Sequence, residues 1–186
     1  MDLVIERCYE ECCAILEVVE HHGDMSLNNA AEVIFQKYFA ICVASHFEKE
    51  LCDSLELYYQ DVSGEHTPAV CFMKNKAIER QYHTWFNWDG KNANTFFALF
   101  GNEFKNYMKA KLEKDALLDE AVKSFLELGR NRNVFVHNDL GTVSSDKTME
   151  EIYQEYCRAC AFIELFPNVL HEYVRFTVEQ ECDKPN

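Results

Sequence analysis

DALLDEAVKSFLELG (residues 115–129), followed at once by RNRNVFVHND (residues 130–139), is the stretch that decides the fold. Its apolar residues recur at helical spacing and form one stripe that faces a core. These residues are Leu117, Leu118, Val122, Phe125, Leu126 and Leu128. The pattern predicts a helix that continues through Val134 and Val136. It should end near residues 138–141, where Asn, Asp and Gly suit a C-terminal cap and a turn.

The rest of the chain repeats this helical periodicity. Further helices are predicted over residues 2–22, 27–61, 68–81, 102–114 and 148–178, and Pro167 should kink or divide the last one. Thr148 and Glu151 are spaced as a capping box at its start. The aromatic residues of 82–101 indicate mainly core, with base stacking as the alternative. We therefore expect an all-α fold, a helical bundle of four or five main helices, with residues 1–186 forming a single domain.

The predicted helix over residues 27–61 is apolar around much of its girth and should lie centrally, with Ser26 as its N-cap. One apolar stripe runs through Ile34, Tyr38, Ile41, Ser45, Glu48, Cys52, Leu55 and Tyr59. A second runs through Phe39, Val43, Phe47 and Leu51. A buried Glu48 carboxylate would need a partner, for which Arg132 or His137 is a candidate. The alternative is that the first stripe is partly exposed at Glu48.

The amino-acid composition limits the cellular compartments in which we expect the protein. Nine cysteines form no regular framework, and neither a signal peptide nor a bilayer-length apolar run is found, so we expect a cytoplasmic protein with reduced thiols and no membrane contact. Cys157 and Cys160 lie on a predicted helix without a second ligand pair, which favours packing over zinc. No metal and no cofactor are expected.

The charge of the chain is strongly acidic but uneven. The net charge of −14 argues against general nucleic-acid binding. Residues 74–132, however, carry 11 basic and 8 acidic side chains, and this is the net-positive part that leads into the 130–139 segment. Five of its lysines form either a phosphate track or a solvated helix face. They are Lys105, Lys109, Lys111, Lys114 and Lys123.

Arg132 and His137 carry the chemistry that the segment suggests. An Arg guanidinium offers a fixed fork of donors that suits phosphate, and a His gains or loses a proton near neutral pH. Five residues apart, their directions on an ideal helix differ by about 140°. They converge if the helix unwinds near His137 or if a second subunit supplies the other half. The plainer alternative is that both side chains stabilise the helix end.

At these residues the chain resembles the HEPN superfamily, whose signature is an Arg, usually followed by a polar residue, and then a His after four to six positions. Arg132–His137 matches with four intervening residues, and Arg130 matches with six. Weaker similarity lies in Ile41–Leu51 and Phe86–Gly101, within a likeness that spans about residues 28–175. The resemblance implies a helical bundle, homodimerisation and metal-independent endoribonuclease activity, in a superfamily that also has inactive and binding-only members. Many relatives have Gly after the His, where this chain has Asn138.

These observations favour an endoribonuclease in which the 2′-hydroxyl of RNA attacks the adjacent phosphorus, with the site at a dimer interface. His137 would be the acid or base, Arg132 would stabilise charge on phosphoryl oxygens, Asn133 would orient the phosphate or His137, and Glu48 would hold one of the pair. Arg130, Lys109 and Lys123 would bind the substrate. Such a protein would be a toxin or a defence protein, with an antitoxin or another protein as a possible partner. The alternative is a non-catalytic helical module that binds RNA, a nucleotide or a protein.

Overall fold

The computed structural model describes residues 3–138, 143 and 146–182, with side chains described as far as residue 178. Within these ranges the chain is all-α, as predicted. Five helices are long, and each corresponds to a helix predicted from periodicity. They are α1 (Leu3–His21), α2 (Met25–Ser63), α6 (Asn102–Lys114), α7 (Ala116–His137) and α8 (Met149–Cys182). No helix in the described part of the chain has both the length and the apolarity of a transmembrane span.

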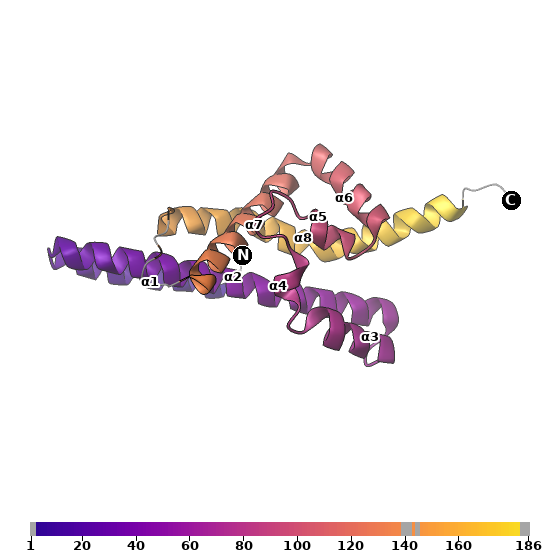
Figure 1. Ribbon diagram of the computed structural model, residues 1–186, viewed down its shortest axis with the longest axis horizontal. Coiled ribbons are helices and arrows are strands. Elements are labelled where there is room, and N and C mark those ends of the chain that lie inside the picture. The colour runs from indigo at the N-terminus through magenta and orange to yellow at the C-terminus, as the bar shows by residue number, and fades with distance from the viewer. Residues whose placement is uncertain (1–2, 139–142, 144–145, 183–186) are drawn as a thin grey trace.

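The long helices α2 and α8 form the frame of the molecule. Figure 1 shows them running along its long axis, with α1 beside the first half of α2 and α7 crossing obliquely against both α2 and α8. Between α1 and α2 the chain turns at Gly23, whose φ of +78° favours glycine. The Asp24 carboxylate then accepts hydrogen bonds from the backbone N–H groups of Ser26 and Leu27. Asp24 is therefore the N-cap of α2, and the prediction of Ser26 was wrong by two residues.

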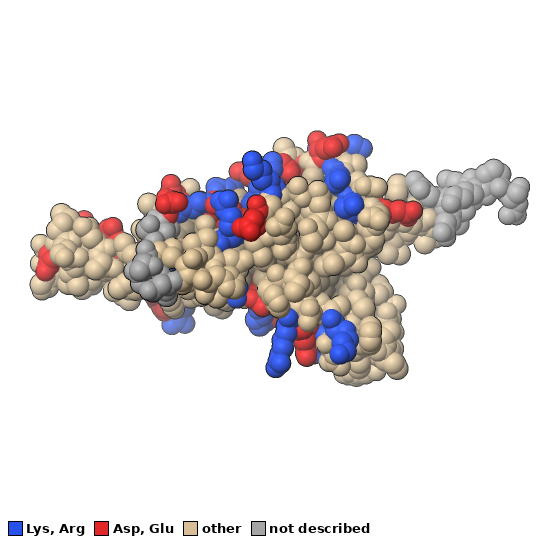
Figure 2. Space-filling view, viewed as in Figure 1, with Lys and Arg blue, Asp and Glu red and all other residues tan. Residues whose placement is uncertain are grey.

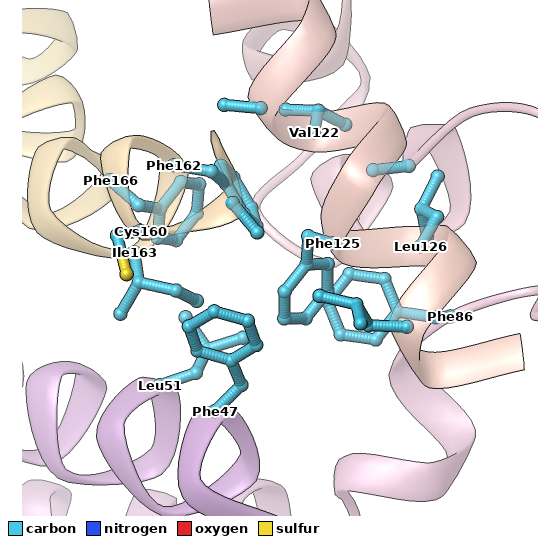
Figure 3. Close-up of a cluster of buried hydrophobic side chains, with 14 of the residues drawn as sticks. Phe47, Leu51, Phe86, Val122, Phe125, Leu126, Cys160, Phe162, Ile163 and Phe166 are labelled. Carbon is cyan, nitrogen blue, oxygen red and sulfur yellow. The ribbon is translucent and has the colours of Figure 1, made fainter. Parts of the chain in front are cut away.

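The core lies where α2, α7 and α8 meet. Phe47 and Leu51 of α2 point toward Phe125 of α7 and Phe162 of α8, as Figure 3 shows. Burying one such side chain contributes about 1.5–3 kcal/mol, so this junction fixes how α7 is oriented. On α2 the buried stripe is the one with Phe47 and Leu51. In the other stripe Ile34 and Tyr38 are 63% and 52% exposed, so that stripe is only partly covered.

Helix α8 begins and continues in ways that its sequence only partly predicts. The capping box is confirmed, because Thr148 Oγ1 accepts from the Glu151 N–H while the Glu151 carboxylate accepts from the Thr148 N–H. Pro167 does not divide the helix, which runs without a break from Met149 to Cys182. The proline costs roughly 3 kcal/mol. Phe166 and Val169, buried on either side of it, offset that cost by holding the helix against the core.

The predicted helix over residues 68–81 is broken into short pieces. Helix α3 (Pro68–Met73) passes into a π-helical turn, η1 (Lys74–Ile78), before a bend at Arg80. Arg80 has a φ of +58°, which a right-handed helix does not accommodate. Two more short helices follow, α4 (Tyr82–Trp85) and α5 (Asn94–Ala98). The segment between α4 and α5 packs against α7 through Phe86 and Trp88, which lie 5.1 and 6.1 Å from the ring of Phe125.

Candidate active site

The C-terminal half of α7 carries the Arg–His motif on a regular helix. The helix starts at the Asp115 cap, whose carboxylate accepts a hydrogen bond from the Leu118 N–H at 3.0 Å, and it ends at His137. The Asn138 side chain closes this end by donating to the Val134 carbonyl at 2.8 Å. The predicted turn residues 139–141 lie outside the described part of the chain. Because the helix persists through His137, it does not unwind to bring His137 toward Arg132.

Arg132 and His137 therefore point in different directions, about 140° apart around one helix. The Arg132 side chain is half-buried, and its guanidinium donates to the Asn133 side-chain oxygen at 3.1 Å. His137 is exposed at the helix end. Among the described residues, no carboxylate forms an ion pair with Arg132. One subunit thus offers a guanidinium with spare donors and an exposed imidazole, but does not bring the two together.

The charges of Glu48 and Arg132 both act on Tyr82, which is buried in the core. Burial raises the pKa of Tyr82 well above its ordinary value, the Glu48 charge and Cys52 raise it further, and the Arg132 charge lowers it. Glu48 of α2 and Arg132 of α7 therefore act on one buried group from two helices. No ion pair joins Glu48 to Arg132 or His137 within the described residues, so the expected direct contact is not seen.

Tyr82 is the residue that sequence reasoning missed. It falls in the aromatic segment that was interpreted as core, and its ring does pack in the core, 5.6 Å from those of Trp85 and Trp88. A signal was available, because a buried tyrosine hydroxyl requires polar neighbours. Nothing in the sequence, however, places it next to residues 34 positions before and 50 positions after it.

Arg130 has different surroundings from Arg132. Its guanidinium donates to both carboxylate oxygens of Glu127, at 2.6 and 2.5 Å. Lys147 also pairs with Glu127, at 3.1 Å, and with Glu155 of α8. Burial by itself would raise the pKa of Glu127, but hydrogen bonds from Arg130 and Lys147 lower it below the ordinary value. Glu127 therefore stays ionised and neutralises part of the positive charge beside the motif.

The predicted phosphate track does not form one continuous strip. Lys111 turns to Glu172 of α8 at 2.8 Å, and Lys105 donates to Asn102. Lys123 is paired with Asp119 on α7, whereas Lys109 and Lys114 are exposed on α6. Figure 2 shows basic and acidic side chains interleaved over this face of the molecule. Lys109 and Lys123 are thus separated on two helices, and Lys123 with Arg130 belongs to the surface of α7.

The donors for a metal site are sparse. Within the described residues, no group of three or more His, Cys, Asp or Glu is arranged to hold a metal ion. Cys160 lies in the core between α2 and α8, and Cys157 is half-buried one turn before it. Burial raises the pKa of both thiols, which therefore remain protonated near neutral pH.

Comparison with known proteins identifies the family. A family model described as RiboL-PSP-HEPN matches residues 6–172, from the first helix to well inside α8. Neither the curated proteins nor the solved structures give a match. The family match contains both halves of the Arg–His motif, Glu48 and Tyr82. Since it spans most of the 186 residues, the chain belongs to the RiboL-PSP-HEPN family.

Proposed function

We propose that this protein is a metal-independent endoribonuclease that cleaves RNA with Arg132 and His137. The observation that carries the proposal is the pair itself. A guanidinium that pairs with no carboxylate among the described residues and an exposed imidazole lie at the end of the same helix, in a chain that belongs to a HEPN family. A cation without its own counter-ion is suited to an anionic phosphate.

The reaction needs only side chains and the RNA. A general base removes the proton from the 2′-hydroxyl, and the 2′-oxygen attacks the adjacent phosphorus. The bond from phosphorus to the 5′-oxygen breaks, and that oxygen leaves with a proton from a general acid. The products are a 2′,3′-cyclic phosphate and a 5′-hydroxyl. His137 serves as base or acid, while Arg132, oriented through Asn133, stabilises the charge that builds on the phosphoryl oxygens.

The site is completed by a second copy of the chain. Arg132 and His137 of one subunit diverge on an unbroken helix, so a two-fold axis beside α7 is needed to bring an Arg132 to the other subunit's His137. Val134 and Val136, which are 41% and 50% exposed, offer apolar surface for that contact. Glu48 is a positioning residue for Arg132 in this proposal, because the charges of both residues act on the buried Tyr82.

A non-catalytic binding module is the competing function. The observation that favours it is charge, because the chain carries −14 and Arg130, Lys123 and Lys147 are all paired with carboxylates. Such a surface attracts RNA weakly. A binding module would leave RNA intact under every condition, which separates the two functions directly.

Incubation of the purified protein with mixed RNA in excess chelator tests the proposal. We expect fragments that end in 2′,3′-cyclic phosphate, with no change on adding a divalent ion. His137→Ala, purified in the same way, is the control for a contaminating ribonuclease. Activity that disappears in chelator and returns with a divalent ion would contradict the mechanism, and intact RNA throughout would favour the binding module.

A further inference from the structure

A groove runs along α7 as far as Val134, one helical turn before His137. Its first hollow, about 340 Å³, is lined by Trp88, Gly90, Lys91, Lys123, Leu126, Glu127 and Arg130. Its second hollow, about 400 Å³, shares Glu127 and Arg130 and continues past Val134 to Lys147. On an ideal helix Lys123, Arg130, Val134 and His137 lie within about 60° of one another, so they share this face. We call these two hollows the α7 groove.

The first hollow has a rigid aromatic wall. Trp88 donates its indole N–H to the His83 carbonyl at 3.3 Å, and its ring lies 4.8 Å from that of Phe86. It also lies so close to Gly129 that a Cβ there would be 1.9 Å from the indole ring. Trp88 remains half-exposed toward the hollow in spite of these contacts. An indole held in place loses little freedom when a flat ligand packs against it.

The rim of the first hollow is cationic. Lys91 is exposed, and Lys123 keeps 63% of its side chain exposed although it pairs with Asp119. Arg130 is 51% exposed beside Glu127, whose carboxylate is the acidic group within the hollow. Surface ion pairs of this kind are worth about 0–1 kcal/mol, so a phosphate can exchange for the carboxylate at small cost. An apolar wall with movable cations on its rim suits a nucleobase with its phosphates.

We propose that the α7 groove binds an unpaired stretch of the RNA substrate beside the scissile phosphate. One base packs against Trp88 and Leu126 in the first hollow, and the flanking phosphates contact Lys91 and Lys123. The groove takes single strands, because a base held within a duplex cannot enter such a hollow. Its volume lies near the lower end of the about 300–1,000 Å³ usual for ligand pockets. This inference rests on the proposed function, since the groove reaches Val134, which shares a face of α7 with the proposed catalytic residue His137.

A protein partner fits the same surface less well. Lysine is depleted at protein–protein interfaces relative to the rest of the surface, whereas two lysines line the first hollow. Single-stranded nucleic acid binding, in contrast, typically combines cations that follow the backbone with aromatic side chains that stack on bases. The direction of the groove also matters, because it follows α7 to Val134, one helical turn before the proposed catalytic residue His137.

Binding of an RNA that cannot be cleaved tests the groove apart from catalysis. The probe is a single-stranded oligonucleotide of mixed sequence with 2′-O-methyl groups, which lacks the attacking hydroxyl. Lys91→Glu with Lys123→Glu should weaken binding at least tenfold. The same variant should lower the slope of log Kd against log salt by about 1.4, because each phosphate contact on a single strand contributes about 0.7.

Arg7→Glu with Lys49→Glu is the matched control. It makes the same change in charge at two exposed cations that each pair with one carboxylate four residues away. Binding should stay within twofold of the wild type.

Tryptophan fluorescence locates the base. The chain has two tryptophans, and Trp85 is buried with its indole N–H bonded to the Ala77 carbonyl. The probe should quench the wild type, and Trp88→Phe should remove the quenching. A duplex of the same sequence should not quench.

Three results would overturn the inference. They are no binding of the probe, equal weakening by the groove variant and its control, or quenching that persists in Trp88→Phe. The first would point to a protein as the occupant. Probe binding without any RNA cleavage would contradict only the nuclease, and cleavage untouched in the groove variant would contradict only the groove.

Discussion

Arg130 and Arg132 stand two residues apart in the same tetrapeptide, yet α7 turns them to opposite sides. Arg130 faces solvent beside Lys123 and His137, and Glu127 holds it with two hydrogen bonds. Arg132 is half-buried, with Asn133 as its hydrogen-bond acceptor, and its charge lowers the pKa of the buried Tyr82. An arginine neutralised by a carboxylate has less to offer a phosphate than one that is not. In the proposed function, Arg130 would therefore contact the substrate along the groove, and Arg132 would stabilise the charge of the transition state.

The difference also shows why spacing alone does not select the catalytic arginine. Arg130 with His137 and Arg132 with His137 both satisfy the motif. On an unbroken helix the longer spacing places Arg130 and His137 within about 20° of each other, whereas the shorter spacing separates Arg132 from His137 by about 140°. The arginine that shares a face with His137 is therefore the one already paired. In the proposed composite site, Arg132 would meet a His137 from another subunit.

The largest expected effect comes from removing the side chain of His137 or Arg132, and it is compared with the effect of removing that of Arg130. His137→Ala and Arg132→Ala should each lower kcat by about 10²–10⁴-fold, the range for loss of an acid–base group or of a charge-stabilising donor. Arg130→Ala should lower kcat/KM by no more than about tenfold, since loss of a screened contact costs about 1 kcal/mol. Cleavage kinetics on one RNA give the values, and circular dichroism checks that each variant is folded. If Arg130→Ala is inactive while Arg132→Ala cleaves normally, the two roles are exchanged.

Mixing the two inactive variants sharpens the same comparison. If each site takes Arg132 from one subunit and His137 from the other, a heterodimer of Arg132→Ala with His137→Ala keeps one intact pair. Random exchange makes half of the dimers mixed, so activity should return to about a quarter of the wild type. The measurement is cleavage after co-refolding of the two variants in equal amounts. No recovery from a verified heterodimer would place both residues of a working pair in one subunit.

Gly129 lies directly before Arg130 on α7, and the Trp88 ring packs close to it. In a helix interior Gly→Ala usually stabilises by roughly 0.5–1 kcal/mol. Here the new Cβ would lie 1.9 Å from the Trp88 ring, so Gly129→Ala should instead destabilise by about 1–3 kcal/mol. Urea denaturation measures the change. In a Trp88→Leu background the same substitution should become neutral or stabilising, and an equal loss in both backgrounds would show that Trp88 is not the cause.

Local patterns predicted the elements, but not how they meet. The apolar stripe of α7 and the Thr148–Glu151 box follow from residues within one or two turns of each other, and both are present. The buried stripe of α2 did not follow from its pattern, because that helix is apolar on several sides and its cover depends on where α7 and α8 cross it. The break at Arg80 was missed for a similar reason. Arg80 has a favourable helix propensity, yet it adopts a positive φ. The position lacks the glycine that would usually indicate such a backbone conformation.

The candidate site likewise has features that local sequence patterns predicted and features that they did not. The divergence of Arg132 and His137 follows from helix geometry, and so does the shared face of Lys123, Arg130 and His137. The place of Glu48 near Arg132 rested on the rule that a half-buried carboxylate needs partners, which gives a requirement but no position. Trp88 and Tyr82 come from a segment of short helices between α3 and α6, where periodicity is too brief to indicate a face. Contacts made through that segment depend on tertiary packing.

The smallest expected effect comes from removing the Glu127 carboxylate, which forms an ion pair with Arg130. The pKa of Glu127 is lowered in the folded chain because the hydrogen bonds from Arg130 and Lys147 outweigh its burial. A lowered folded-state pKa stabilises the protein above the ordinary value of 4.5, and that contribution is lost as pH falls through the folded-state pKa. Glu127→Gln should therefore lower stability at pH 7 by up to about 1 kcal/mol, or roughly 2–4 °C in Tm, and the difference should diminish as pH falls below 4.5. Thermal melts across this range measure it, with Glu113→Gln on the exposed surface of α6 as the control.

Glu127→Gln also frees Arg130 of its counter-charge, so binding of the 2′-O-methyl RNA should tighten. A melting difference that is constant with pH, together with unchanged RNA binding, would show that Glu127 does not restrain Arg130.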